Sequence, residues 1–409
     1  MQDMNSRADR LFTQGKVEAA LLAYQQAVAS HSDVAESYEG LGAASLLCGD
    51  FETAIESYQF LLKRTPCGPA TFCNLGHAYL FSGSFDKALR CFYRCLALHP
   101  GYVDAHMGLA LAHLALGRFK QGWRHYERRR QTQMPVPQWK GESLAGRRIL
   151  IHAEQGLGDT IQFVRYVPLV AARGGEVVLQ VPPPLRRLLS QMEGVTQVIS
   201  SKDPFPWASC HSSLLSLPRI FGTDITTIPA AIPYLSCSPA ESDAWTGHPT
   251  KVGLKAGLVW AGDPRNSRDR HRSISLQSLQ PLFEIAGVSL FSLQRGEAAG
   301  QVRDLSSQTR LHNLESHHSD LYDTAAAIAA LDLVISVDTS VAHLAGALGK
   351  PVWILLPYVA DWRWLLHRPD SPWYPTARLF RQPKPGDWKA VIDLVTTALR
   401  ERVNRGETE

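Results

Sequence analysis

Apolar and small residues in the first third of the chain recur every 34 positions. Four columns keep this spacing through four units: Gly15, Gly49, Gly83 and Gly117; Ala20, Ala54, Ala88 and Gly122; Tyr24, Tyr58, Phe92 and Tyr126; and Ala8, Gly42, Gly76 and Ala110. Small residues let two helices cross closely, and the aromatic ring fills the space between layers. The pattern therefore predicts a solenoid of antiparallel helix pairs over residues 1–135.

The helical period ends after a run of charged residues. Residues 127–130 read Glu-Arg-Arg-Arg, which we interpret as a solvated helix end rather than a patch for an anionic partner. Pro135 and Pro137 then stop the pattern, because proline cannot continue a helix. From Arg147 on, short apolar runs alternate with helical stretches, which is typical of a parallel sheet.

Two such series follow each other and are separated by a segment rich in serine and proline, residues 229–250. The first series predicts strands at 148–152 and 176–181 and helices at 158–172 and 184–192. The second predicts strands at 256–260, 288–293, 331–337 and 352–356 and helices at 276–285, 320–330, 341–348 and 388–403. We therefore expect an α plus α/β chain with two Rossmann-like domains, 136–250 and 251–409, facing each other across a cleft.

Composition narrows the class of protein. With 409 residues, 45% hydrophobic and 20% charged, the chain is globular and too long for one ordinary core. A net charge of +4 argues against a dedicated nucleic-acid binder. The polar start, the lack of long apolar runs and the seven cysteines without a C-x-x-C pair favour a cytoplasmic protein with neither disulfides nor a zinc site.

The first chemical motif, Glu154-Gln155-Gly156-Leu157-Gly158-Asp159, lies between a predicted strand and a helix. Ile161 occupies the position of the third glycine in a dinucleotide fingerprint, so NAD binding is disfavoured. Asp159 would lie in the first helical turn at the carboxyl edge of the sheet. The simpler interpretation of this carboxylate is that it complements the helix dipole.

A second motif, Val337-Asp338-Thr339-Ser340-Val341-Ala342-His343, has the same setting in the last domain. Asp338 or Thr339 can cap the helix, whose first amides would then face a phosphate or diphosphate. His343 follows Thr339 by one turn and could donate to the same anion, or be a structural histidine. The loop 263–273 carries four arginines in eight residues, which could clamp phosphate or simply be solvated.

Two resemblances follow from these residues. Leu75-Gly76-His77-Ala78-Tyr79 and the 34-residue columns resemble the tetratricopeptide repeat over Met1 to Gln133. Gly158-Asp159, and Asp338-Thr339-Ser340 with His343 and Ala345, resemble glycosyltransferase family 9, the heptosyltransferase group. Matching stretches run over 154–166 and 331–351, and from Asp361-Trp362-Arg363-Trp364 to Arg381-Gln382. As a whole the chain resembles bacterial proteins that fuse such repeats to such an enzyme.

The second resemblance implies a GT-B fold and a metal-independent, inverting transfer of sugar from a nucleotide-diphosphate donor, with no cofactor. It implies that Asp159 is the general base and Arg272 a phosphate ligand. The remaining donor-side residues would be Gln294, Glu297, Asp338, Thr339, Ser340 and His343, and the acceptor-side residues Gln155, Gly156, Gly158 and Gln162. Ser340 replaces a glycine common in heptosyltransferases, so the resemblance does not specify the donor. The chain also lacks a D-x-D motif, which agrees with metal independence.

The leading hypothesis is a glycosyltransferase whose repeat groove recruits the acceptor. A protein or peptide is one such acceptor, and a glycan or a lipid-linked acceptor stays open. Repeats that serve only for self-association are the simpler alternative. The competing hypothesis for the whole chain is a non-catalytic scaffold whose GT-B part is inactive or senses a nucleotide sugar. The sequence specifies neither sugar, base, linkage nor oligomeric state.

Overall fold

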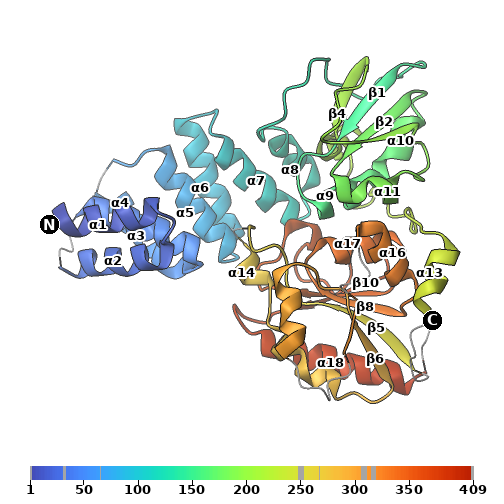
Figure 1. The fold of residues 1–409 in the computed structure, drawn as a ribbon. Coiled ribbons are helices and arrows are strands. Elements are labelled where there is room, and N and C mark those ends of the chain that lie inside the picture. Colours follow the sequence, from blue (N-terminus) through green and yellow to red (C-terminus); the bar gives the residue numbers. More distant parts are fainter. Residues whose placement is uncertain are drawn as a thin grey trace. The chain divides into compact units, whose positions relative to one another are not determined.

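The chain folds into two compact units, Met1–Arg130 and Gln131–Glu409, in the computed structural model (Figure 1). The structure describes residues 2–30, 34–64, 66–246, 253–266, 268–304, 311–314 and 319–406. The division between the units falls in the segment where the sequence predicts the end of the helical array. The domain boundary expected at residues 250 and 251 lies outside the described residues.

The first unit consists of the helix pairs predicted from the 34-residue period (Figure 1). The helices are α1 (Gln2–Thr13), α2 (Val17–Ser30), α3 (Ala35–Cys48), α4 (Phe51–Arg64), α5 (Pro69–Phe81), α6 (Phe85–Leu98), α7 (Val103–Ala115) and α8 (Phe119–Tyr126). Gly49 ends α3 with φ of 82°, and Gly83 connects α5 to α6 with φ of 84°. Only glycine adopts this left-handed backbone at low cost, which explains one column of the repeat.

In the column that contains Gly42 and Gly76, an aromatic ring presses on the backbone of each glycine. A Cβ atom added at Gly76 would lie 2.6 Å from Cε1 of Phe92, whose side chain is fully buried. A Cβ added at Gly108 would lie 2.2 Å from Cζ of the same ring. Phe92 thus fills the space between two neighbouring repeats, as the sequence pattern predicts.

The charge run after α8 is solvated in part, as the sequence suggested, because Arg128 and Arg130 are exposed, but Arg129 between them is buried. The Arg129 side chain is only 5% exposed and its Nη1 lies 3.1 Å from Oε1 of Glu127. Its guanidinium also lies 5.4 Å from the centre of the Tyr126 ring. Pairing with Glu127 and stacking on an aromatic face let this arginine be buried.

The second unit begins with a four-stranded parallel sheet in the order β3-β2-β1-β4. Its strands are β1 (Arg148–His152), β2 (Glu176–Val181), β3 (Gln197–Ser200) and β4 (Cys210–Ser213). Its helical segments are α9 (Leu157–Phe163), η1 (Val164–Tyr166), α10 (Val167–Ala171), η2 (Pro183–Leu185), α11 (Arg186–Leu189), η3 (Leu214–Ser216) and α12 (Leu217–Ile220). The helix predicted over 158–172 is therefore interrupted by a 3₁₀ turn, just before Pro168, which has no N–H to donate.

A six-stranded parallel sheet follows, in the order β10-β9-β8-β5-β6-β7. Its strands are β5 (Leu254–Val259), β6 (Val288–Ser292), β7 (Leu311–Asn313), β8 (Leu333–Val337), β9 (Val352–Leu356) and β10 (Ala377–Arg381). Its helical segments are α13 (Pro239–Thr246), α14 (Asp269–Arg272), η4 (Leu276–Leu279), α15 (Gln280–Phe283), η5 (Glu297–Asp304), α16 (Leu321–Ala329), α17 (Ser340–Ala347), η7 (Trp362–Trp364) and α18 (Trp388–Asn404). If these strands are renumbered from 1 to 6 in chain order, the order across the sheet is 6-5-4-1-2-3, which is that of a Rossmann fold.

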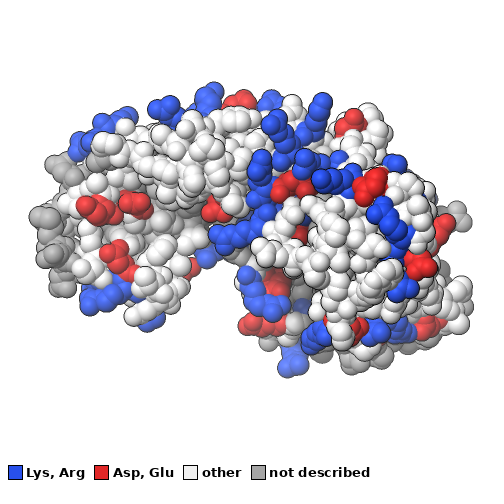
Figure 2. Space-filling view, turned by 90° about the horizontal axis from the view of Figure 1, so that it is seen from above, with Lys and Arg blue, Asp and Glu red and all other residues white. Residues whose placement is uncertain are grey.

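The predicted fold class, a helical solenoid followed by two Rossmann-like sheets, is confirmed. The core of the larger sheet contains side chains of β5, β8 and β9 together with Val391, Val395 and Leu399 of the final helix. Among the described residues, none of the helices combines the length and apolar character needed to cross a bilayer. Lys and Arg side chains are interspersed with Asp and Glu on the face shown in Figure 2, as the small net charge leads one to expect.

Candidate functional site

Each of the two motifs found in the sequence directly follows a strand. The first motif follows β1 of the smaller sheet, and the second follows β8, which is the fourth strand of the larger sheet in chain order. β1 lies between β2 and β4, and β5 lies between β6 and β8. In such sheets the connections leave in opposite directions at this point, and ligands bind at the carboxyl ends of the strands there. Asp159 follows β1, Arg272 follows β5, and Asp338 follows β8, so all three come from these positions.

Asp159 is the third residue of α9 and both of its carboxylate oxygens have partners. Oδ2 accepts a hydrogen bond of 3.1 Å from the backbone N–H of Gly156, which lies just before the helix. Oδ1 is paired with Nη2 of Arg363. Burial raises the pKa of Asp159, and the Arg363 guanidinium opposes this effect. The side chain is 21% exposed, so part of the carboxylate still faces solvent.

Helices α9 and α17 meet at Gly158. A Cβ atom added there would lie 2.9 Å from Cδ2 of His343 and 3.5 Å from Cα of Ser340. Glycine is therefore required at this position by the close approach of a second helix. The contact brings the carboxylate of the first motif next to the start of the helix in the second motif.

Arg272 joins its loop to the second motif. Its Nη1 donates a 2.8 Å hydrogen bond to the carbonyl oxygen of Asp338, and its Nε donates to Oδ1 of Asp269 at 3.0 Å. Burial and the nearby Asp361 raise the pKa of Asp338, while Arg272 and Arg363 lower it. The Asp338 side chain is 12% exposed, and its Oδ1 lies 3.9 Å from Nε2 of His343.

The other arginines of the 263–273 loop lie differently. Arg265 is 89% exposed along its side chain and pairs with Asp263 at 2.6 Å, within its own turn. Arg270 is exposed and Arg268 is half-buried, while Ser267 lies outside the described residues. Of the four arginines, Arg272 is the one for which a contact with the second motif is seen.

The predicted anion site lies at the start of α17, where the N-cap residue is Thr339. Thr339 occupies the N-cap position, but its side chain does not cap the helix. Its hydroxyl instead lies 3.1 Å from Oγ of Ser336. The amides of Ser340 and Val341 therefore receive no cap from the Thr339 side chain and can donate to a ligand, whereas the Ala342 amide donates to the Thr339 carbonyl oxygen at 3.1 Å.

His343 and Gln294 are buried among protein groups. His343 Nδ1 lies 2.9 Å from the Tyr374 hydroxyl, and its ring stacks on Trp364 at 5.3 Å. Burial holds the pKa of His343 well below its usual value, so the ring is neutral and fits the structural role left open by the sequence. The Gln294 side chain accepts from the amides of residues 260 and 261, and donates to the carbonyls of residues 261 and 295.

The remaining predicted residues divide between surface and interior. Gln155 and Gly156 are exposed at the start of α9, and Glu297 is exposed at the start of η5. Gln162 is fully buried; its Oε1 accepts from Nε of Arg363, and its Nε2 is buried without a hydrogen-bond partner. In the part of the chain that the structure describes, no three His, Cys, Asp or Glu side chains lie close enough to hold a metal ion.

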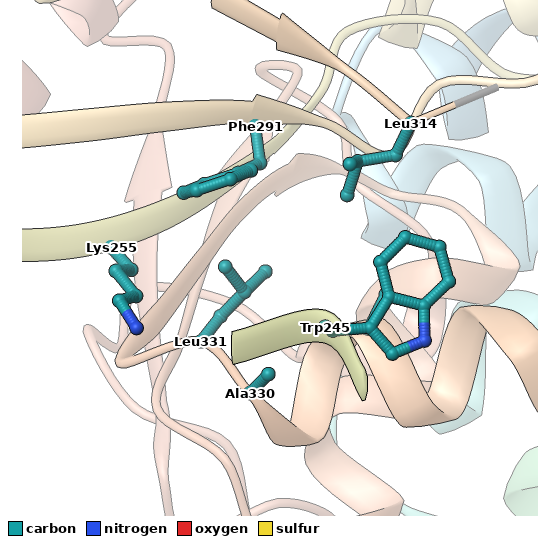
Figure 3. Close-up of a pocket in the computed structure, with 7 residues that line it drawn as sticks. Trp245, Lys255, Phe291, Leu314, Ala330 and Leu331 are labelled. Carbon is teal, nitrogen blue, oxygen red and sulfur yellow. The ribbon is translucent and has the colours of Figure 1, made fainter. Parts of the chain in front are cut away.

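A separate small cavity lies elsewhere in the second unit (Figure 3). Its lining residues are Trp245, Lys255, Phe291, Leu314, Ala327, Ala330 and Leu331. The volume is about 10 Å³, enough for a single water molecule and too small for a nucleotide. It is a packing gap between the sheet and helices α13 and α16.

Comparison with known proteins supports the repeat structure of the first unit. The family described as tetratricopeptide repeat matches residues 5–69 and 73–128. The first unit is an array of tetratricopeptide repeats. Protein FlbA of Caulobacter vibrioides is 28% identical over 324 residues, which are 70% of this chain and 53% of that protein. The chain thus spans about half the length of this curated relative.

Two solved structures align with part of this chain. The ADP-heptose lipopolysaccharide heptosyltransferase II of E. coli aligns with 62% of this chain and 99% of its own, at 15% identity and a TM-score of 0.43. A family 9 glycosyl transferase of Veillonella parvula aligns with 65% of this chain and 100% of its own, at 12% identity and a TM-score of 0.48.

Sequence reasoning missed two buried arginines at this site. Arg363 contacts Asp159 and Gln162, although it lies in a stretch that the sequence had singled out without giving it a role. Arg165 donates to the carbonyl oxygen of Trp373 at 2.7 Å and to the Tyr234 hydroxyl at 3.0 Å. Arg165 of η1 and Arg363 of η7 thus connect the first sheet's domain to the second's.

Proposed function

We propose that this protein is a glycosyltransferase that moves a sugar from a nucleotide-diphosphate donor to an acceptor hydroxyl, with inversion and without a metal ion. The observation that carries the proposal is the meeting of α9 and α17 at Gly158. It joins a carboxylate, Asp159, to a helix start that can bind an anion beside Arg272. A base next to a diphosphate site is the minimum that this reaction needs.

The reaction is a single displacement. The acceptor oxygen attacks the anomeric carbon and loses its proton to Asp159, while the bond from that carbon to the diphosphate oxygen breaks. Negative charge then grows on the departing nucleoside diphosphate. Arg272 and the backbone amides of Thr339, the N-cap residue, and of Ser340, the first residue of α17, would stabilise this charge, since they are fixed before the reaction begins.

The interior residues would support this site without touching the donor. We propose that Gln294 holds the loop after β5, through its three hydrogen bonds to the backbone of residues 260 and 261. His343 holds α17 against Tyr374 and Trp364. Glu297 is exposed at the start of η5 and is the proposed ribose contact.

The repeat array would supply the acceptor. Stacked helix pairs present an extended surface that suits a peptide or a protein segment. We therefore propose a protein acceptor recruited by the first unit and modified by the second. Gln155 and Gly156 are exposed beside Asp159 and would face the acceptor.

One observation favours the alternative, a non-catalytic scaffold that senses a nucleotide sugar. Both oxygens of Asp159 already have partners, Gly156 and Arg363, and an ion-paired carboxylate is a weaker base. The two functions differ in turnover, since the scaffold would bind the donor and release no transferred sugar.

The donor can be found by thermal unfolding of the full chain with UDP, GDP, ADP, CMP and their sugars, each with and without EDTA. A ligand at 100 times its Kd stabilises the folded state by about 2.7 kcal/mol, which raises the Tm measurably. One nucleotide is expected to stand out, unaffected by EDTA. Loss of the shift with EDTA would contradict a metal-independent site.

The base is tested by Asp159→Asn, which keeps the shape of the side chain and removes its proton affinity. We expect turnover to fall at least about 100-fold while the affinity for the donor stays unchanged. Asp393→Asn is the matched control, because Asp393 is an exposed partner of Lys389 on α18. Full turnover by a folded Asp159→Asn protein would exclude Asp159 as the base.

A further inference from the structure

The Arg363 guanidinium is fixed by three acceptors at once. Nε donates to Oε1 of Gln162, Nη1 donates to Oδ1 of Asp361 at 2.7 Å, and Nη2 donates to Oδ1 of Asp159. All three nitrogens are therefore engaged, and the side chain is only 10% exposed. Arginine is the residue that can satisfy three acceptors arranged in one plane.

The turn that carries Arg363 orients it before it reaches Asp159. Asp361 precedes η7 and accepts from the backbone N–H of Arg363 at 3.2 Å as well as from its side chain. The guanidinium also lies 4.8 Å from the centre of the Trp362 ring. The conformation of Arg363 is thus determined by its own neighbours, so it can impose a position on Asp159.

Asp159 is held from two sides as a result. The Gly156 amide binds Oδ2, and the Arg363 guanidinium binds Oδ1. The first contact comes from the residue just before the helix that carries Asp159, and the second comes from the domain of the larger sheet. With both contacts in place, rotation of the carboxylate about its last bond is restricted.

We infer that Arg363 is the positioning residue for Asp159: it fixes the direction in which the carboxylate meets the acceptor and favours its charged form. This inference rests on the proposed function, in which Asp159 accepts the acceptor's proton. Arg363 itself touches neither the donor nor the acceptor. Its link from the second Rossmann-like domain to the base of the first makes the orientation of that base depend on how the two domains are packed.

Ionisation is the part of this role that a purely structural arginine would not share. A cation beside a buried carboxylate favours the charged form, which is the form a general base needs. Removing the cation leaves the carboxylate buried and raises its proton affinity. The base is then protonated, and therefore inactive, up to a higher pH.

The test compares Arg363→Met and Arg363→Lys with the wild-type full chain, using the donor identified by thermal unfolding. For Arg363→Met we expect kcat to fall about 10- to 100-fold, because a misplaced base loses most of its advantage. The KM for the donor is expected to change less than about threefold. The acid limb of the pH profile of kcat/KM should move up by about one pH unit.

Arg363→Lys keeps the charge and loses the planar set of donors. It should keep the acid limb close to that of the wild type while kcat remains reduced, which separates the charge from the geometry. Arg368→Lys is the control, since Arg368 also binds a carboxylate, Asp370, through Nε and Nη2, but outside the candidate site. This control should match the wild type in both respects.

A second measurement needs no substrate. The unfolding free energy of the wild type minus that of Asp159→Asn, followed against pH, reports the pKa of Asp159 in the folded state. Since that pKa lies above the unfolded value, ionisation of Asp159 costs stability as the pH rises through it. In the Arg363→Met background this loss should occur at higher pH.

The outcomes separate the inference from the proposed function. If the wild type transfers sugar and Arg363→Met has the same kcat and acid limb, the positioning role is wrong. A change in donor KM with an unchanged acid limb would also overturn it, because Arg363 would then be a donor ligand. If the wild type transfers no sugar at all, the proposed function fails. Independently of transfer, the charge effect would be overturned if the loss of stability on ionisation of Asp159 occurred at the same pH in the Arg363→Met background as in the wild type.

Discussion

At the scale of the residue, sequence spacing and burial suggest different roles for His343. His343 follows Thr339 by one helical turn, which by sequence alone suits a ligand for an anion. In the folded chain its ring is 4% exposed and lies between Tyr374 and Trp364. The His343 ring is thus covered by aromatic residues from a later part of the chain, Trp364 and Tyr374.

Gly158→Ala tests the contact between α9 and α17. The added methyl group would come within 2.9 Å of the His343 ring, so we expect the unfolding free energy to fall by about 1–3 kcal/mol and donor affinity to weaken. Denaturant unfolding and donor-induced Tm shifts measure the two effects. Gly300→Ala is the control, because an added Cβ there meets no atom within 4 Å. Equal stability of both variants would mean that the helices approach less closely than described.

At the scale of the element, the repeat helices contain histidines that burial keeps neutral. Burial lowers the pKa of His77 on α5 to about 4, and that of His125 on α8 to about 4. His77 lies against the Phe92 ring at 5.0 Å, and Nδ1 of His125 lies 2.9 Å from Nδ1 of His106. A proton added to His77 or His125 must therefore enter a site that disfavours charge.

The repeat array should lose stability in acid. Below about pH 6.5 these histidines become protonated in the unfolded chain, whereas in the folded array they stay neutral down to about pH 4. The unfolding free energy therefore falls as the pH is lowered from about 6.5 to about 4. His77→Phe should reduce that slope, as measured by denaturant unfolding followed by helical circular dichroism at pH 7.5 and pH 4.5. The unfolding free energy of each protein at pH 4.5 is compared with that of the same protein at pH 7.5, so that a general effect of the substitution on stability cancels. If His77→Phe lost as much unfolding free energy between pH 7.5 and pH 4.5 as the wild type, burial of His77 would not be a cause of the acid sensitivity.

Whether an element could be predicted depended on its length and its apolar pattern. The strands β1, β2, β5, β6, β8 and β9 are runs of buried apolar residues, and the sequence located them all. β4 reads Cys-His-Ser-Ser and β7 has three residues, so neither shows a strand's pattern although both pair in a sheet. Their backbones are recruited by neighbouring strands, which tertiary structure alone supplies.

At the scale of the whole molecule, the division into two units predicts independent folding. Residues 131–409 contain both sheets and the whole candidate site, and residues 1–130 contain the repeat array. We expect the separate 131–409 fragment to keep its cooperative unfolding transition and its donor affinity, but to lose modification of an acceptor recruited by the repeats. Circular dichroism, donor-induced Tm shifts and transfer to intact acceptor measure these properties. A fragment that does not fold would contradict the independence of the units.

The sequence by itself determined the repeat array, the alternation of strands and helices and the two motifs after the strands, because these are local patterns of spacing. Tertiary structure alone decided that Arg363 meets Asp159, 204 positions away, and that Gln294 and His343 turn inward. Strand order determines which loops meet, and strand order depends on long-range pairing that no local period encodes. The proposed base was therefore visible in the sequence, whereas the arginine that orients it was not.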